Sequence, residues 1–571
     1  MTPITESDTA EKKTSTKKTN TYTGGLDGLP DGKGLNIGYE VADRHVLKGA
    51  GERTAIRWIK KNRSFEDITY QQLTEKSNRF ANVLNKVKIK KGQTVCTLLG
   101  RVPDLYFTAI GSFKSGAVFC PMFSVFGPEP IIQRLNLGKV QVLVTNLEAY
   151  HEKIEPNIGR IPELKYILIT DIGQDLNEQV LSFPGQMESV TDKYEILPTS
   201  PDDLALLHFT SGTTGMPKGA LHAHQAIEMH FATAKLVLDL HPGEIYWCTA
   251  DPGWVTGTSY GIIAPLANGV TCLLDEDEFD GMRWYSILAE HHVNKWYTAP
   301  TAIRRLMRMD PGVVQNYDLS QLRLILSVGE PLHADAVRWG LETFKVPVLD
   351  NWWQTETGGI MISNLPSMEI KPGSMGKPLP GITAAIAAIT EDKFEIINSM
   401  DVSGQIVIRR GWPSMFRGYL NNEARYQKCF HEEWYLTGDL ARIDSDGYFW
   451  FIGRADDIIK TSGHLVGPAE LESVLVQHSA VAEAAVIGKP NPAIGELIKA
   501  FVVLKPRSHA DEETKTQILA HCRKNLGAAI APREIQFLES IPKTRSGKIL
   551  RRLLKARELG LPEGDLSTLE K

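Results

Sequence analysis

The stretch of residues 210–219, TSGTTGMPKG, most constrains what this chain can fold into and bind. It follows the apolar run 204–207, which indicates a buried strand, so the stretch is expected to be a loop at the end of that strand. Its glycines permit backbone conformations closed to other residues and leave peptide N–H groups free to form an anion site. Hydroxyls and a lysine add donors suited to a polyphosphate, although the spacing is not that of a Walker P-loop.

A flexible Gly/Ser/Thr connection is the ordinary interpretation of such a stretch. The stretch, however, resembles the phosphate loop of the adenylate-forming superfamily, which includes acyl-CoA synthetases, adenylation domains of peptide synthetases and luciferases. The resemblance implies that Lys218 contributes to catalysis. It also implies that the loop binds nucleotide through Thr210, Ser211, Gly212, Thr213, Thr214, Gly215 and Lys218.

With 571 residues the chain is too long for a single core, so two or more domains are expected. The net charge of -5 gives no reason to expect nucleic acid or an acidic membrane as a partner. No apolar run reaches the length of a membrane helix, and the start of the chain lacks the pattern of a signal peptide. Six scattered cysteines fit reduced thiols, so we expect a cytoplasmic protein.

The sequence predicts a polar tail at 1–35, a large domain at 36–454 and a small domain at 455–571. Residues 1–35 are polar and are expected to form an N-terminal tail that docks on the first domain. Apolar runs at 95–99, 140–144 and 322–328 alternate with helical patterns, which predicts an α/β fold of layered subdomains with mostly parallel sheets. Short alternating strands after residue 380 indicate a small antiparallel, β-barrel-like subdomain.

The compact segment after Arg454 has strands and helices of its own. We therefore expect an adenylate-forming domain at 36–454 and a small α+β domain at 455–571. The resemblance implies that this C-terminal domain is mobile and that Asp456 is its hinge.

A second motif, DNWWQTETGG at residues 350–359, follows a predicted strand. Paired tryptophans are usually core residues, and a lone glutamate there is usually a solvated turn residue. The resemblance implies instead that Glu356 is catalytic and helps to hold Mg²⁺ with ATP, a hard cation that prefers carboxylates. It implies nucleotide contacts for Asp350, Asn351, Trp352, Trp353, Gln354 and Thr355.

Three further segments match nucleotide-binding positions of the superfamily. The resemblance implies that Gly329, Glu330 and Pro331 pack on adenine and that Asp439 accepts both ribose hydroxyls. Arg454 matches a nucleotide-contacting arginine. A plain turn is the alternative for the Thr-Gly-Asp sequence that ends at Asp439.

The basic run at residues 542–552 is the second decisive feature. Such runs are usually solvated faces or nucleic-acid patches. This one resembles the superfamily's C-terminal catalytic motif, in which Lys548 reaches the substrate carboxylate and the α-phosphate. A positioned cation removes the repulsion between the two anions in the transition state. Acylation would remove that charge, and the resemblance implies control by a protein lysine acetyltransferase and a deacetylase.

Within the superfamily the chain resembles the AMP-forming acetyl-CoA synthetases, through residues 251–257 and 352–356. This resemblance implies a short acyl pocket closed by Trp353 and walled by Val255, Thr256 and Val328. We expect acetate first and propionate second, because one methylene is typically worth only about 1–3 kcal/mol.

The coenzyme A site is expected on the small domain. The resemblance implies that Ser462 and Gly463 line the pantetheine tunnel and that Arg523 lies near the CoA phosphates. Leu465 stands where the family usually has an arginine, so one phosphate contact is missing. A peripheral Mg²⁺ site is implied at Val476, His478 and Val481, although a lone histidine between apolar residues is more often structural.

The leading hypothesis is therefore a two-step ligase that forms acetyl-AMP and then acetyl-CoA by domain alternation, with ATP, acetate and CoA as substrates. The alternatives are a propionyl- or other short-chain acyl-CoA synthetase, the same enzyme run in reverse to make ATP, and a carrier-protein adenylating enzyme. A protein that only binds nucleotide is disfavoured by intact Lys218, Glu356, Asp439 and Lys548.

Overall fold

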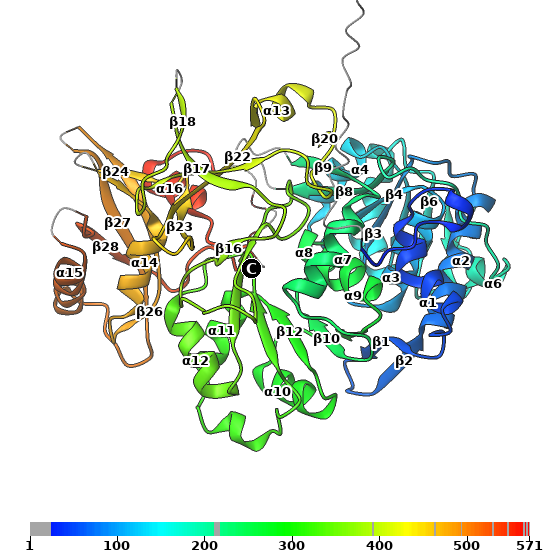
Figure 1. Ribbon diagram of the computed structural model, residues 1–571, viewed down its shortest axis with the longest axis horizontal. Coiled ribbons are helices and arrows are strands. Elements are labelled where there is room, and N and C mark those ends of the chain that lie inside the picture. Colours follow the sequence, from blue (N-terminus) through cyan, green and yellow to red (C-terminus); the bar gives the residue numbers. More distant parts are fainter. Residues whose placement is uncertain are drawn as a thin grey trace, which may run out of the picture.

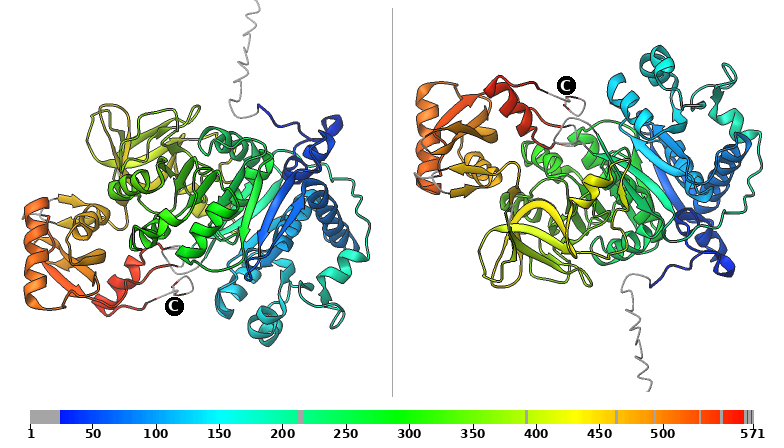
Figure 2. Two further views of the ribbon diagram at one scale, coloured as in Figure 1. Left: turned by 90° about the horizontal axis from the view of Figure 1, so that it is seen from below. Right: turned by 90° about the horizontal axis from the view of Figure 1, so that it is seen from above.

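The computed structural model describes residues 24–210, 217–390, 393–461, 464–492, 494–527, 530–544, 547–563, 566 and 569. Two large sheets and a smaller antiparallel sheet form the part of the chain up to Arg454 (Figure 1). The described residues after Arg454 form a separate C-terminal lobe. Figure 2 shows this lobe, in orange and red, at the end of the molecule opposite the blue N-terminal elements.

The first sheet has nine strands among the described residues, and its central strands are parallel, as expected from the sequence. Its edge pairs are antiparallel. In spatial order the strands are β16 (Lys377–Pro378), β15 (Ile362–Ser363), β14 (Val348–Trp352), β13 (Leu324–Ser327), β12 (Lys295–Thr298), β10 (Ile245–Cys248), β11 (Thr271–Asp275), β1 (Thr54–Ile59) and β2 (Phe65–Thr69).

The second sheet has eight strands within the described ranges and is also parallel at its centre. In spatial order the strands are β20 (Gly418–Tyr419), β9 (Lys218–Ala223), β8 (Leu204–Thr210), β4 (Val118–Met122), β3 (Thr94–Leu98), β5 (Val140–Thr145), β6 (Tyr166–Ile169) and β7 (Val180–Ser182). Strands β8 and β9 are antiparallel, so the glycine-rich stretch connects the two arms of a hairpin.

One hydrophobic core joins the two large sheets. It contains Ile56 and Leu274 of the first sheet, Val95 of the second, and apolar residues of α2 (Tyr70–Lys86) and α3 (Pro103–Lys114) between them. Helix α2 begins with a capping box in which the Thr69 hydroxyl accepts from the Gln72 N–H and the Gln72 side chain accepts from the Thr69 N–H.

The third sheet is antiparallel, as the alternating pattern after residue 380 predicts. Its strands are β17 (Ala384–Ile389), β18 (Phe394–Ile396), β19 (Gly404–Arg409), β21 (Phe430–His431), β22 (Trp434–Ile443) and β23 (Phe449–Arg454). Strand β22 carries Asp439 and β23 ends at Arg454, which are partners in adjacent strands. This sheet therefore delivers two candidate site residues together.

The C-terminal lobe has its own sheet and core. Its strands are β24 (Ile459–Thr461), β25 (His464–Val466), β26 (Val481–Asn491), β27 (Gly495–Leu504) and β28 (Glu534–Phe537). Apolar residues of α14 (Pro468–Val476) and α15 (Glu512–Leu526) cover the sheet, with Leu471, Leu475 and Ile518 fully buried. Helix α16 (Arg551–Leu559) follows the basic run and packs on β26.

The remaining helices connect the strands of the large part. They are α1 (Arg44–Leu47), α4 (Pro128–Leu137), α5 (Leu147–Ala149), α6 (Phe183–Glu188), α7 (Ala226–Leu236), α8 (Val255–Thr258), α9 (Ala264–Ala267), α10 (Gly281–Glu290), α11 (Pro300–Met307), α12 (Ala334–Phe344) and α13 (Glu423–Gln427). Short 3₁₀ turns lie at Pro30–Gly32, Glu155–Arg160 and Val313–Asn316, and π-helical turns at Tyr39–Asp43, Tyr150–Ile154 and Ser259–Ile263.

The described part of the N-terminal segment packs on the large part of the protein. The N–H groups of Asp27 and Gly28 donate to the Glu40 carboxylate at 3.1 and 2.6 Å, and the Leu35 N–H donates to the Thr199 carbonyl. All six cysteines are free thiols. In the part of the chain that the structure describes, no helix combines the length and hydropathy that crossing a bilayer requires.

Candidate active site

The glycine-rich loop is held between two paired strands. Thr210, the last residue of β8, is the cross-strand partner of Lys218, the first residue of β9. Residues 211–216, which include the predicted ligands Ser211, Gly212, Thr213, Thr214 and Gly215, lie outside the described residues. Desolvation and the nearby charge of Arg425 lower the pKa of Lys218, while Glu356 opposes this shift. Lys218 and Glu356 thus face the same space.

Glu356 is oriented by Tyr419, which no sequence motif marks. The Tyr419 hydroxyl donates to Glu356 Oε1 at 2.7 Å, and burial followed by the charge of Glu356 raises the pKa of Tyr419. Tyr419 reaches this place because β20 pairs with β9, with Gly418 opposite Leu221. No local pattern marks a two-residue strand of this kind.

Glu356 alone does not make a complete metal site. Among the described residues, no group of three potential side-chain ligands surrounds a common point. Mg²⁺ in nucleotide enzymes is commonly bound by one or two carboxylates together with substrate phosphates. The Glu356 carboxylate beside the phosphate-loop lysine therefore fits Mg²⁺ that arrives with ATP.

Asp439 is buried and only partly satisfied. Trp352 Nε1 and Gln354 Nε2 donate to its Oδ2 at 2.9 and 2.7 Å, and Arg454 Nη1 lies 3.1 Å from its Oδ1. Within the described chain, Oδ1 has no hydrogen bond of good geometry. Burial raises the pKa of Asp439, against the charge of Arg454. A buried carboxylate oxygen that still lacks a hydrogen-bond donor can accept from a ribose hydroxyl, the role predicted for Asp439.

The two predicted cations meet beside Asp439. Burial opposes the charge of Arg454, but Asp439, Asp456 and Glu356 together raise its pKa. Desolvation and then the charge of Arg454 lower the pKa of Lys548, while Asp439 and Asp457 raise it. The Lys548 side chain is exposed to solvent.

The loop that carries Lys548 is seated on the large part. Gly547 has φ +89°, and a Cβ there would lie 2.1 Å from Thr301 Oγ1 and 2.5 Å from Glu330 Oε1. Thr301 donates to Glu330 at 2.6 Å, and Arg304 forms an ion pair with the same carboxylate. This contact holds Lys548 near Asp439 and Arg454.

In the segment predicted to pack on adenine, the Gly329 backbone and the Glu330 carboxylate have different surroundings. Gly329 has φ +95° and is exposed, with nothing within 4 Å of its Cβ position, so its backbone is open to a flat ring. The Glu330 carboxylate instead supports Thr301 and Arg304. Pro331 is half-buried beside it.

The residues around Trp353 form a rigid apolar corner. Val255, Thr256, Val328 and Trp353 are all buried, and three of them belong to one core cluster. Trp353 Nε1 donates to the Tyr297 hydroxyl at 3.3 Å, and the Tyr260 ring meets the indole edge to face with centroids 5.1 Å apart. The indole is thereby fixed in place.

Asn351 of the same motif holds Tyr297 in place by hydrogen bonds. The Tyr297 hydroxyl donates to Asn351 Oδ1 at 2.8 Å, and Asn351 Nδ2 donates to the Ser327 carbonyl. Asp350 is buried, and burial raises the pKa of its carboxyl. The Asn351 side chain is therefore committed to the sheet, while Thr355 is half-buried.

The predicted CoA and hinge residues are only partly described. Ser462 and Gly463 lie outside the described residues. Arg523 is exposed near the end of α15, and Asp456 is exposed with Oδ1 3.5 Å from Arg454 Nε. These assignments remain predictions.

The proposed peripheral Mg²⁺ site at Val476, His478 and Val481 also remains a prediction. The His478 carbonyl accepts from the Val481 N–H at 3.0 Å, and His478 Nδ1 accepts from the Ala480 N–H at 3.2 Å. Val481 is fully buried. These bonds are those of a helix-to-strand turn.

The chain belongs to the AMP-binding enzyme family. It matches that family over residues 43–420 and matches the AMP-binding enzyme C-terminal domain over residues 470–548. The two matches contain most of the candidate site, including Lys218, Glu356 and Lys548.

Relatives with high coverage narrow the class further. An acetyl-coenzyme A synthetase of Bacillus subtilis (strain 168) is 43% identical over 538 residues, which cover 94% of this chain and 93% of the relative. An acetyl-coenzyme A synthetase of Methanothrix thermoacetophila is 37% identical over 566 residues, covering 94% and 84%.

Solved structures agree with the fold. An anthranilate CoA ligase, AuaEII, in complex with anthranoyl-AMP matches with a TM-score of 0.83 and 29% identity, covering 93% of this chain and 98% of that one. A Brucella canis acyl-CoA synthetase matches with a TM-score of 0.72 and 32% identity, covering 94% and 97%.

Proposed function

We propose that the chain is an AMP-forming acetate–CoA ligase, which converts ATP, acetate and CoA to AMP, diphosphate and acetyl-CoA. The observation that carries this proposal is the meeting of Lys548 with Asp439 and Arg454, across the contact between Gly547 and Thr301. A cation delivered by the C-terminal lobe to a nucleotide site on the large part is what adenylate formation requires.

In the first step, an acetate oxygen attacks the α-phosphorus of ATP and the bond to diphosphate breaks. Both reactants are anions, so a fixed positive charge stabilises the transition state more than the ground state. Lys548 and Lys218 supply this charge, and Asp439 and Arg454 hold the ribose side of the nucleotide. Mg²⁺ bound at Glu356 would neutralise the departing diphosphate.

In the second step, the CoA sulfur attacks the acyl carbonyl of acetyl-AMP, its proton is lost to solvent, and AMP leaves. In the orientation described above, Gly547 lies against Thr301 and Glu330. We propose that the C-terminal lobe turns at Asp456, just after Arg454, to break this contact and present the Ser462–Gly463 segment and Arg523 to CoA.

Selectivity for a short acid follows from the apolar corner at Trp353. An indole fixed by Tyr297 and Tyr260 leaves no flexible wall that longer acids could displace. Acetate is the preferred acid and propionate the second.

The test is acid-dependent release of diphosphate and AMP over a chain-length series, with and without CoA. Acetate should be preferred and AMP release should require CoA; adenylation without any thioester would favour a carrier-protein enzyme. Trp353→Gly should shift the preference to longer acids, since removing the indole opens the pocket. An unchanged chain-length preference in a folded W353G protein contradicts the pocket assignment.

Lys548 is also the proposed target of a protein lysine acetyltransferase and deacetylase. Its exposed side chain is accessible to a modifying enzyme, and acetylation removes the charge on which the first step depends. Full acetylation at Lys548 should abolish adenylate formation and leave thioester formation from supplied acetyl-AMP. Retained adenylation in protein acetylated at Lys548, verified by mass spectrometry, contradicts this regulation.

A further inference from the structure

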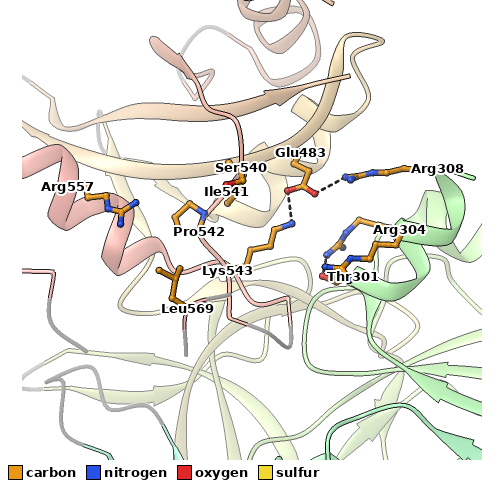
Figure 3. Close-up of a pocket in the computed structure, with 11 residues that line it drawn as sticks. Thr301, Arg304, Arg308, Glu483, Ser540, Ile541, Pro542, Lys543, Arg557 and Leu569 are labelled. Carbon is orange, nitrogen blue, oxygen red and sulfur yellow. Dashed lines mark hydrogen bonds and ion pairs between the residues drawn. The ribbon is translucent and has the colours of Figure 1, made fainter. Parts of the chain in front are cut away.

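A cavity of about 410 Å³ lies between helix α11 of the large part and the C-terminal lobe (Figure 3). Its lining includes Arg304 and Arg308 from α11 and its C-terminal end, and Glu483 and Lys543 from the lobe. Arg304 is paired with Glu330, and both Arg308 and Lys543 are paired with Glu483. Each of these three cations is paired with a carboxylate, which favours a role in docking over a role in binding an anion.

Helix α11 presents a polar face to the lobe. Thr301, Arg304 and Arg308 stand at positions i, i+3 and i+7, which lie on one side of a helix. Ile303 and Leu306 are buried in the core on the other side. The helix is therefore anchored in the large part and offers a fixed row of donors.

Glu483 bridges the two parts of the protein. Arg308 Nη2 donates to Glu483 Oε1 at 2.9 Å and to the Ala482 carbonyl at 3.0 Å, while Lys543 Nζ donates to Glu483 Oε2 at 2.7 Å. Figure 3 shows the carboxylate between the two cations. Burial raises the pKa of Glu483, but Lys543 and Arg308 outweigh this and hold it below the usual range.

The bridge is directly connected to the catalytic loop. Lys543 pairs with Ile549 in an isolated β-bridge, and the Thr544 N–H donates to the Lys548 carbonyl at 2.7 Å. The Lys548 loop is thus fixed at its base by Glu483 and at Gly547 by Thr301 and Glu330. Both contacts tie the loop to α11, because Thr301 lies in this helix and Arg308, the partner of Glu483, directly follows it.

We propose that Arg308 and Glu483 form an interdomain clasp that selects the adenylate-forming orientation of the C-terminal lobe. They are positioning residues: they act through Lys543 and the loop on Lys548, without touching substrate. The clasp crosses between the two parts, so it is lost when the lobe turns away. It therefore stabilises only the first of the two working orientations, and its removal shifts the population toward the second. This inference rests on the proposed function.

The experiment measures the two half-reactions separately in Arg308→Ala and Glu483→Gln proteins. The first is acetate-dependent exchange of diphosphate into ATP, and the second is transfer of acetyl from supplied acetyl-AMP to CoA. Because partly exposed ion pairs contribute modestly, we expect the first to fall about two- to fivefold while the second is unchanged or faster. Arg308→Lys, which keeps the charge, should restore most of the exchange.

Arg409→Ala is the matched control, because Arg409 and Glu433 form an exposed ion pair of 2.8 Å within the large part of the protein. The R308A/E483Q protein should lose less than the product of the single losses, since both variants break one interaction. Equal loss in both half-reactions, loss of the second alone, or effects no larger than those of R409A would overturn the clasp. Absence of acetate-dependent exchange in the unmodified protein would instead overturn the proposed function.

Discussion

Gly547 provides the sharpest test of how the lobe presents Lys548. Its Cβ position lies 2.1 Å from Thr301 Oγ1 and 2.5 Å from Glu330 Oε1, whereas ordinary contact begins at 3.4 Å. In Gly547→Ala the loop must therefore move by more than about 1 Å. A displacement of about 1 Å at a catalytic group typically costs about a hundredfold in rate. We expect acetate-dependent diphosphate exchange to fall by that order.

The second half-reaction separates this effect from misfolding. Transfer of acetyl from supplied acetyl-AMP to CoA should be nearly unchanged in Gly547→Ala, because the Thr301 contact belongs to the adenylate-forming orientation. Gly527→Ala is the matched control: Gly527 has φ +82° in the same lobe, but nothing lies within 4 Å of its Cβ position. If G547A and G527A lose exchange equally, backbone strain and not the contact is responsible, and the reasoning is refuted.

Two further predictions concern buried titratable side chains. Asp439→Asn should turn an amide toward Arg454 and weaken nucleotide binding about 10- to 100-fold, measured by titration with ATP; unchanged affinity would exclude Asp439 from the ribose site. Burial lowers the pKa of His222 and His230 to about 4 and of His224 to about 3, from 6.5. The unfolded chain then binds more protons below pH 6.5, so stability is full above 6.5 and falls toward pH 4 by about 1.4 kcal/mol per pH unit for each histidine. Thermal melts from pH 7 to 5 measure this, and a melting temperature independent of pH would contradict it.

The sequence predicted those features that local pattern determines. Apolar runs marked the strands β3, β5, β8 and β13, because buried parallel strands are continuously apolar. Motif resemblance selected Lys218, Glu356, Asp439 and Lys548 as one site, and in the described structure Lys218 lies near Glu356 and Lys548 near Asp439.

The sequence did not reveal the residues whose place depends on tertiary contacts. Tyr419 reaches Glu356 only through the pairing of β20 with β9, and Glu483 meets Arg308 only in one orientation of the lobe. Neither lies in a motif, and side chains that meet from distant segments carry no periodic signal. The Glu330 carboxylate bonds to Thr301 beside Gly547, a contact that the sequence did not indicate, and its packing on adenine stays a prediction.

The pairing of β8 with β9 has a practical consequence. Thr210 and Lys218 are cross-strand partners, and β9 is also the strand on which β20 places Tyr419. The sheet thus fixes both ends of the phosphate loop, whatever residues lie between them. We therefore expect that residues 211–216 can be replaced by the corresponding loop of a relative. Lys218 and the Tyr419–Glu356 hydrogen bond should keep their places in such a chimera.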